Sequence, residues 1–146
     1  MKIIQIVGYA NSGKTTFIKK LIPELRKLGS VAVIKHLGEH DYVLEGGRDT
    51  TEFFEAGADA SIGIDSEKTV VALRKNSLDN SLNLLSQSGM KFVIIEGFKK
   101  YSFSKIAIGN IKVEKCILSN PSGEEVIAHL DRFEDFQSVT IEGLIE

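Results

Sequence analysis

The sequence contains very little cysteine, proline or tryptophan, and it has no long apolar run. Of its 146 residues, one is cysteine, two are proline and none is tryptophan. A single cysteine, Cys116, excludes an intrachain disulfide framework, and its place in an apolar stretch predicts a small buried side chain. No apolar run approaches the roughly 20 residues of a membrane-spanning helix. Because Met1 leads directly into a predicted strand, we expect no signal peptide and a cytoplasmic protein with no membrane partner.

The chain also has no large excess of either positive or negative charge. The chain has 18 lysines and arginines against 20 aspartates and glutamates, which gives a net charge of −2. Nucleic-acid-binding domains are usually basic, so we expect no nucleic-acid partner. A polyphosphate ligand would then depend on local positive charge, for which the candidates are Lys14, Lys35, Arg48, Lys99 and Lys105. The length and the ordinary apolar content predict a single domain over residues 1–146.

Predicted strands alternate with predicted helices along the chain. We expect strands at 2–7, 31–34, 60–64, 69–73, 92–95, 106–108 and 115–118, and helices at 14–28, 48–56, 78–86 and 133–145. The alternation predicts an α/β protein, a three-layer sandwich like that of P-loop NTPases with a mostly parallel central sheet. Segments 60–64 and 69–73 predict a β-hairpin extension, and the wholly apolar segment 92–95 predicts an interior strand.

A glycine-rich motif lies between the first strand and the first helix. The run Gly8, Tyr9, Ala10, Asn11, Ser12, Gly13, Lys14, Thr15 reads G-x-x-x-x-G-K-T, the Walker A pattern, and Thr16 follows it. Glycines allow the backbone to curl so that N–H groups face phosphate oxygens. The lysine suits β- and γ-phosphates, and the Thr15 hydroxyl suits Mg²⁺. We therefore predict a phosphate-binding loop over Gly8–Thr16 with a bound nucleotide and Mg²⁺.

Polar residues follow the other predicted parallel strands. Ligands of open parallel sheets bind beyond the carboxyl ends of the strands. Glu96 ends the apolar strand 92–95 and is predicted as the carboxylate on the Mg²⁺ side, held directly or through water. Asp49 is a further candidate metal ligand, or else an acid that stabilises a helix start.

Four more residues are candidate contacts to a second anion or to a substrate: Lys35, His36, Arg48 and Lys99. For Lys35 and His36 a surface pair is the alternative. Asn120 is a candidate base contact or a turn residue before Pro121. The N-K-x-D pattern of guanine-binding proteins is absent. The residues alone therefore do not show whether the nucleotide is GTP or ATP. No catalytic residue is assigned.

Several stretches together resemble the molybdopterin-guanine dinucleotide biosynthesis protein B family. They are Ser12-Gly13-Lys14-Thr15-Thr16, Ile34-Lys35-His36, Gly47-Arg48-Asp49 and Glu96-Gly97-Phe98-Lys99. The resemblance runs from Lys2 to about Ile108, with a different loop chemistry over 37–46. It implies a GTP-binding accessory protein with weak GTPase activity in molybdenum cofactor biosynthesis. It also implies a homodimer, with molybdopterin and its guanylyltransferase as partners.

Two other functions are consistent with the phosphate loop. A small-molecule kinase using ATP or GTP would need an acceptor site and usually a mobile lid that carries arginine. The loop 38–47 is a candidate lid, but it holds no arginine before Arg48. A regulatory switch GTPase would need N-K-x-D and an Asp-x-x-Gly after the central strand, and the sequence has neither. No glutamine follows Glu96-Gly97 to orient an attacking water, so any hydrolysis is expected to be slow.

Overall fold

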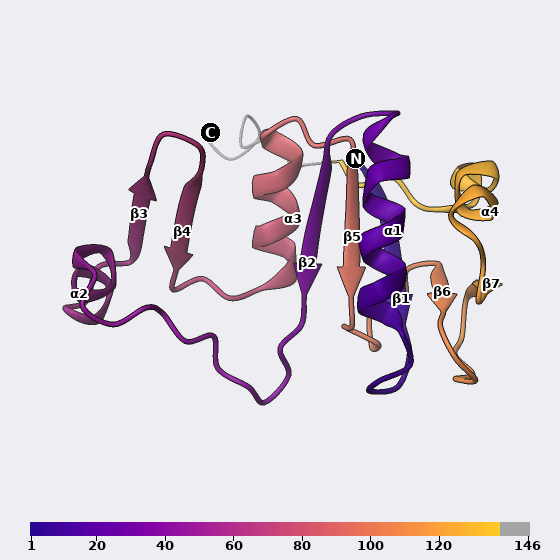
Figure 1. The fold of residues 1–146 in the computed structure, drawn as a ribbon, viewed down its shortest axis with the longest axis horizontal. Coiled ribbons are helices and arrows are strands. Elements are labelled where there is room, and N and C mark those ends of the chain that lie inside the picture. Colours follow the sequence, from indigo (N-terminus) through magenta and orange to yellow (C-terminus); the bar gives the residue numbers. More distant parts are fainter. Residues whose placement is uncertain (138–146) are drawn as a thin grey trace, which may run out of the picture. The chain divides into compact units, whose positions relative to one another are not determined.

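The computed structural model describes residues 1–137 and divides into two compact units. The first unit contains Met1–His36 and the chain from Leu82, and the second contains Leu37–Ser81. The boundary falls inside α3 (Leu78–Gln87), so the two halves of that helix are assigned to different units. Figure 1 shows the elements along the chain.

The first unit is built on a five-stranded sheet in the order β2-β5-β1-β6-β7, and every neighbouring pair is parallel. Its strands are β1 (Lys2–Val7), β2 (Val31–Lys35), β5 (Phe92–Glu96), β6 (Lys105–Ala107) and β7 (Cys116–Ser119). This confirms the predicted α/β class. The apolar β5 is an interior strand, as expected, because it lies between β2 and β1.

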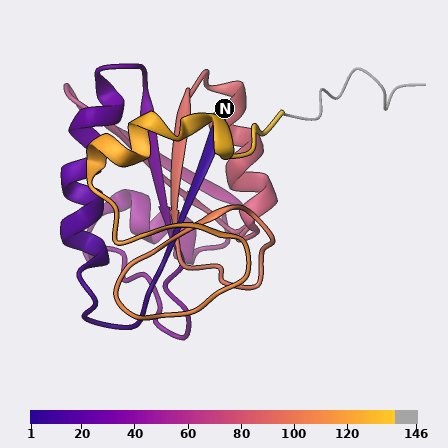
Figure 2. The same ribbon diagram turned by 90° about the vertical axis from the view of Figure 1, so that its right-hand side faces the viewer.

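Helices cover both faces of this sheet (Figure 2). On one face, Ile4 and Ile94 pack with Leu21 of α1 (Lys14–Arg26) and with Val126 of α4 (Gly123–Ala128) in one buried cluster. Side chains alternate between the faces of a strand, so Gln5 lies on the opposite face from Ile4. The part of α3 that begins at Leu82 lies on that opposite side. The Leu82 side chain is fully buried.

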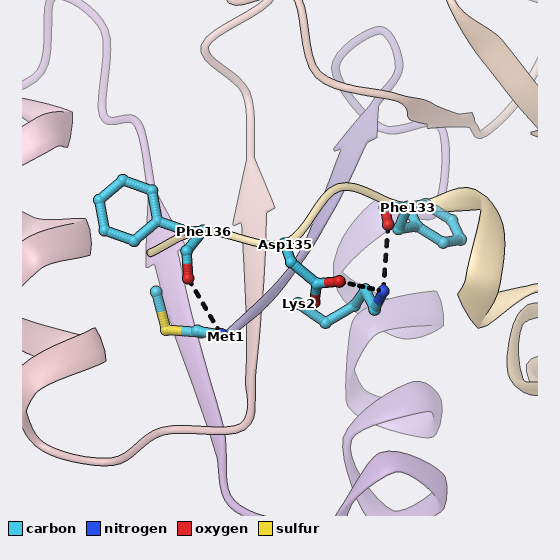
Figure 3. A network of polar contacts seen from close by, with 5 residues as sticks. All are labelled: Met1, Lys2, Phe133, Asp135 and Phe136. Atoms are coloured by element: carbon cyan, nitrogen blue, oxygen red, sulfur yellow. Dashed lines mark hydrogen bonds and ion pairs between the residues drawn. The ribbon is translucent and has the colours of Figure 1, made fainter. Parts of the chain in front are cut away.

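The closing part of the first unit differs from the predicted helix over 133–145. Within the described residues, 133–137 are not helical, and Asp135 forms an isolated antiparallel bridge with Lys2. Figure 3 shows the Lys2 ammonium donating to Asp135 at 3.0 Å and to the Phe133 carbonyl at 3.2 Å. The Met1 ammonium donates to the Phe136 carbonyl at 3.1 Å. Residues 138–145 of the predicted helix lie outside the described residues.

Two further elements near this end were not predicted: α4 and a single 3₁₀ turn at Leu130–Arg132. The Ser122 hydroxyl caps α4 by accepting a hydrogen bond from the Glu125 N–H at 3.1 Å. The spacing Ser-x-x-Glu is a recognised helix-start pattern, so the signal was present in the sequence. The prediction that Cys116 is buried was wrong, since it is exposed at the start of the edge strand β7.

The second unit contains α2 (Asp49–Glu55) and an antiparallel pair, β3 (Ala60–Ile64) and β4 (Thr69–Leu73). The Ser61 hydroxyl donates to the Thr50 carbonyl at 2.7 Å and so links β3 to α2. In the turn, Asp65 accepts hydrogen bonds from the backbone N–H groups of Glu67 and Lys68, both at 2.8 Å. The predicted hairpin is therefore confirmed. In the described part of the chain, no helix has the length and apolar character to cross a membrane.

Candidate functional site

The glycine-rich loop leaves the carboxyl end of β1 and leads directly into α1. At Gly8, an added Cβ would lie 2.6 Å from both the Ile108 carbonyl oxygen and the Ser12 hydroxyl oxygen. At Gly13, φ is +96°, a left-handed conformation that side chains rarely adopt. Both glycines of the motif are therefore required by the backbone, which supports the sequence prediction of a tightly curled loop.

The N-terminus of α1 has the properties of an anion-binding site. Its first turn contains no acidic residue, and no side chain caps it. The first N–H group of α1 that donates to a backbone carbonyl is that of Phe17, which lies 3.0 Å from the Gly13 oxygen. Among residues 1–137 the N–H groups of Lys14, Thr15 and Thr16 have no hydrogen-bond acceptor. Unpaired N–H groups and the helix dipole together favour a bound anion.

Two side chains of the loop complete this cradle. The Lys14 ammonium donates to the carbonyls of Gly8 at 3.0 Å and Tyr9 at 2.7 Å, which holds its positive charge against the loop. An ammonium has three donors, so one remains for a ligand. The Ser12 hydroxyl is buried and has no partner within the described residues. A phosphate oxygen in the loop would supply the partner that this hydroxyl lacks.

Glu96 lies at the end of β5 and on the α1 side of the sheet. It follows Phe92 and Ile94 at the period of two that places side chains on one face, and both pack in the cluster with α1. Its register partner on β2 is Lys35, and the Lys35 ammonium lies 3.9 Å from the Glu96 carboxylate. The Glu96 side chain is 13% exposed, whereas that of Lys35 is 56% exposed. Because this ion pair is loose, the carboxylate remains able to act as a ligand of a cation.

An aromatic wall extends from β2 to the loop after β5. The His36 ring stacks on Phe98 at a centroid distance of 4.3 Å and an interplanar angle of 21°. Phe98 meets Tyr101 edge-on at 5.7 Å, and Tyr101 stacks with Phe103 at 5.9 Å. The roles of Tyr101 and Phe103 were not predicted, although the recurrence of aromatic residues over 98–103 was a signal.

These segments enclose one cavity of about 1030 Å³, which is at the upper end of the range of small-molecule sites. It brings together most of the predicted site: the loop residues from Ala10 to Thr16, the pair Lys35 and His36, then Glu96 and Lys99. Its lining is Ala10, Asn11, Ser12, Gly13, Lys14, Thr15, Thr16, Lys35, His36, Glu96, Gly97, Phe98, Lys99, Lys100 and Tyr101. The predicted loop residue Tyr9 is next to it, with its ring 5.7 Å from the Lys99 ammonium.

Two buried polar side chains of the sheet donate hydrogen bonds to the backbone of the loop that carries the aromatic wall. Gln5 of β1 donates to the carbonyls of Gly97 and Phe98, both at 2.8 Å. Lys105 of β6 donates to the carbonyls of Tyr101 at 2.7 Å and Phe103 at 2.9 Å. Gln5 is fully buried, and the loop it supports is tight: a Cβ on Gly97 would lie 3.0 Å from the His36 Cβ. The positioning role of Gln5 was missed, although one amide inside an apolar strand was a visible signal.

The structure places Arg48 and Asp49 in the second unit. The Arg48 guanidinium binds the Glu45 carboxylate through two contacts, at 3.0 and 3.2 Å. The hydrogen bond and charge of Arg48 lower the pKa of Glu45. Asp49 is the first residue of α2. The roles of Arg48 toward a second anion and of Asp49 toward a metal stay predictions.

Asn120 uses both ends of its side-chain amide on Gly109. Its Oδ1 accepts from the Gly109 N–H at 2.7 Å, and its Nδ2 donates to the Gly109 carbonyl at 2.9 Å. Its φ of +47° is typical of a turn. This geometry supports the turn alternative, and a base contact by Asn120 stays a prediction. Gly109 faces the phosphate loop, because a Cβ there would lie 3.3 Å from the Ser12 Cβ.

The residues present fit Mg²⁺ better than a metal with an all-protein ligand set. Among residues 1–137, no group of three or more histidines, cysteines or carboxylates gathers around a point. Thr15 and Glu96 line the same cavity. Because Mg²⁺ takes one or two protein ligands with phosphate and water oxygens, these two residues form a sufficient protein contribution.

These features define a parallel α/β protein in which a glycine-rich loop at the end of β1 opens a helix inside a polar cavity. The family model described as MobB, molybdopterin guanine dinucleotide synthesis protein B, matches residues 3–132. The chain therefore belongs to the MobB family.

Named relatives of the chain carry the same description. The molybdopterin-guanine dinucleotide biosynthesis adapter protein of Haemophilus influenzae is 32% identical over 117 residues, which cover 77% of this chain and 66% of the relative. A Methanocaldococcus jannaschii protein that carries this name provisionally is 35% identical over 128 residues, 87% of this chain and 51% of the relative. The chain thus spans about half to two thirds of the length of these relatives.

Solved structures show the same fold. The crystal structure of Bacillus subtilis MobB has a TM-score of 0.72 and 22% sequence identity, and the match covers 93% of this chain and all of that chain. A crystal structure titled molybdopterin-guanine biosynthesis protein B has a TM-score of 0.57 at 25% identity, covering 88% of this chain and 95% of the other. At these identities the likeness concerns the fold.

Proposed function

We propose that this chain binds GTP with Mg²⁺ in the cavity at the end of β1. We also propose that it acts as an adapter in the formation of molybdopterin guanine dinucleotide. The observation that carries the proposal is the single cavity shared by Lys14, Thr15 and Glu96. A loop of free N–H groups, a lysine and a carboxylate suit a nucleotide polyphosphate and its metal.

The residues have separate tasks in this proposal. The N–H groups of Lys14, Thr15 and Thr16 donate to phosphate oxygens, and the remaining Lys14 donor adds positive charge. The Thr15 hydroxyl and the Glu96 carboxylate hold the Mg²⁺, which would neutralise phosphate charge. The stacked pair of His36 and Phe98 adds an aromatic surface to the cavity lining, which is suited to a flat ring.

The choice of GTP and the adapter role depend on membership of the family and on the names of the relatives. By the same relation we propose a molybdopterin guanylyltransferase and molybdopterin as partners, a homodimeric state and a cytoplasmic location. A measurement of molar mass in solution tests the homodimer directly. A mass equal to one chain at micromolar concentration would contradict it.

Hydrolysis of the bound nucleotide should be slow. Fast P-loop enzymes use an arginine that stabilises the transition state and a glutamine that orients water, and the arginine alone contributes about 10³–10⁵ in rate. The arginines of the described first unit, Arg26 and Arg132, do not line the cavity, and neither does a glutamine. The cavity is thus better suited to holding a nucleotide than to consuming it.

The test is a calorimetric titration of the purified chain with GTP and with ATP, each with and without Mg²⁺, followed by phosphate-release kinetics. We expect tighter binding of GTP, strengthening by Mg²⁺ and slow phosphate release. A preference for ATP would contradict the GTP assignment. Fast phosphoryl transfer to a small acceptor would favour the kinase alternative.

Two variants connect the result to the site. Lys14→Ala should weaken nucleotide binding by at least about tenfold, because a charged hydrogen bond contributes about 1.5–3 kcal/mol. Glu96→Gln should reduce the strengthening by Mg²⁺ without weakening Mg²⁺-free binding. Glu55→Gln, an exposed carboxylate of α2, is the matched control. Normal binding by the Lys14 variant would overturn the phosphate-loop assignment.

A further inference from the structure

A second, smaller cavity lies beside the nucleotide cavity, and its lining is strongly basic. It has a volume of about 280 Å³, and Lys99, Lys100 and Tyr101 line both cavities. The smaller one adds Lys105 and Lys115, with Glu114 as the one acidic residue of its lining. Its volume is just below the usual range of small-molecule sites, so it suits one compact group more than a whole nucleotide.

Two of the four lysines of this cavity, Lys105 and Lys115, are held in place by neutral groups. Lys105 is only 3% exposed, and its ammonium donates to the Tyr101 and Phe103 carbonyls. The Lys115 ammonium donates to the Ser102 carbonyl at 2.6 Å. Among residues 1–137, no carboxylate lies within ion-pair distance of any of the four lysines. The charges of Lys105 and Lys115 are therefore positioned by hydrogen bonds but are not balanced by an ion pair.

The electrostatics of Lys105 favour an anion beside it. Burial lowers the pKa of its ammonium, and the charge of Lys115 lowers that pKa further, while Glu134 and Glu114 raise it. A buried cation is costly unless it is paired, since neutral carbonyls supply hydrogen bonds without balancing the charge. Each ammonium also retains donor capacity after these hydrogen bonds.

We infer that this cavity is a second anion site, which takes the phosphomonoester group of a molecule other than the nucleotide held by the phosphate loop. Four lysines against one glutamate favour a dianion over a single carboxylate, because a dianion neutralises more of the local charge. The shared wall of Lys99, Lys100 and Tyr101 would place this group beside the nucleotide. The inference does not depend on nucleotide binding, because Lys105 and Lys115 lie outside the phosphate loop.

The experiment is an NMR titration of the ¹⁵N-labelled chain with inorganic phosphate and with glycerol phosphate, followed at the amides of Ser102, Glu114 and Lys115. Lys14→Ala is titrated in parallel to remove the phosphate loop. We expect saturable shifts at these amides in both proteins at millimolar phosphate. The absence of such shifts in the natural chain, or their loss in Lys14→Ala, would overturn the inference.

Three substitutions test the charge directly. Lys115→Gln should weaken phosphate binding at these amides by about tenfold. Lys112→Gln, an exposed lysine on the same segment that does not line the cavity, should leave it unchanged. Glu114→Gln should strengthen binding, because it removes the one negative charge of the cavity lining. Equal affinity in the Lys115 and Lys112 variants, with spectra otherwise intact, would contradict the proposed site.

Failure of GTP binding alone would leave these results unchanged and would concern only the nucleotide proposal.

Discussion

Gln5 and Lys105 lie opposite each other on the neighbouring parallel strands β1 and β6, and each donates two hydrogen bonds to carbonyls of the same loop. Both side chains are buried on the sheet face opposite α1. Together they donate hydrogen bonds to four backbone carbonyls of this loop, those of Gly97, Phe98, Tyr101 and Phe103. The wall of the candidate site is therefore supported by the sheet and not by the loop alone.

Replacing Gln5 tests this support. Gln5→Leu keeps the volume but leaves the Gly97 and Phe98 carbonyls without these donors, which should lower the free energy of unfolding by about 1–3 kcal/mol. Urea unfolding measures the loss, and hydrogen exchange at residues 97–101 should accelerate. Gln87→Leu, an exposed glutamine at the end of α3, is the control. Equal unfolding midpoints for the two variants would contradict the supporting role.

Gly8 should not tolerate even the smallest side chain. In Gly8→Ala the new Cβ would lie 2.6 Å from the Ile108 carbonyl oxygen and from the Ser12 hydroxyl oxygen, so the loop must shift. Such overpacking costs about 1–3 kcal/mol, and nucleotide binding should be lost with it. Thermal unfolding and nucleotide titration check both effects. Gly46→Ala has open space around it and should change neither.

Asn120 offers a test between a base contact and a structural clamp. Asn120→Ala removes both hydrogen bonds to Gly109 and should lower the free energy of unfolding by about 1–3 kcal/mol. A clamp acts on the loop, so the affinities for GTP and ATP should fall by the same factor. Asn110→Ala, an exposed neighbour, serves as the control. A selective loss of GTP affinity would instead indicate that Asn120 reads the base.

Glu134 should make stability depend on pH on the acid side. Burial raises the pKa of Glu134, but hydrogen bonds from the Ser104 N–H and hydroxyl and from the Glu134 backbone, together with the charge of Lys115, outweigh burial. The pKa therefore lies below its ordinary value. A carboxylate with a lowered folded-state pKa contributes stability that is fully present above about pH 4.3, the ordinary glutamate value, and is lost as pH falls further.

Glu134→Gln should therefore reduce the free energy of unfolding by about 1 kcal/mol near neutral pH, where a charged acceptor becomes a neutral one. The difference from the natural chain should shrink as the pH falls below that glutamate value. Denaturant unfolding at a series of pH values measures it. Glu67→Gln, an exposed residue of the β3–β4 turn, should show no such trend. A difference that grows on acidification would contradict the assignment.

The sequence predicted those parts of the fold that depend on local pattern. The β3 and β4 ranges and the first strand match because alternating or continuous apolar residues and turn residues mark them directly. The phosphate loop was recognisable because two glycines, a lysine and a threonine occur at fixed spacing. The predicted loop residues and Glu96 are also neighbours in the structure, since parallel strands end at one edge of the sheet.

What was missed depends on contacts between distant residues. Gln5 meets Gly97, and Lys2 meets Asp135, so no local window contains both partners. The segment after Phe133 has apolar residues that suit a helix, yet its start pairs with the first strand instead. Cys116 lies in an apolar stretch but begins an edge strand, where one flank has no neighbouring strand among residues 1–137, and it is therefore exposed.

The strands β2 and β5 are hydrogen-bonded neighbours, yet the chain between them includes all of the second unit. Closing a longer connection costs little, about 0.6 kcal/mol for each doubling of its length. Every residue that lines the cavity at the phosphate loop belongs to the first unit. Residues 37–81 can therefore diverge in length and surface chemistry within the family while the register of the sheet and the phosphate loop stay the same. Variation among relatives should accordingly concentrate in this connection, which makes it the place where each family member could acquire its own contacts.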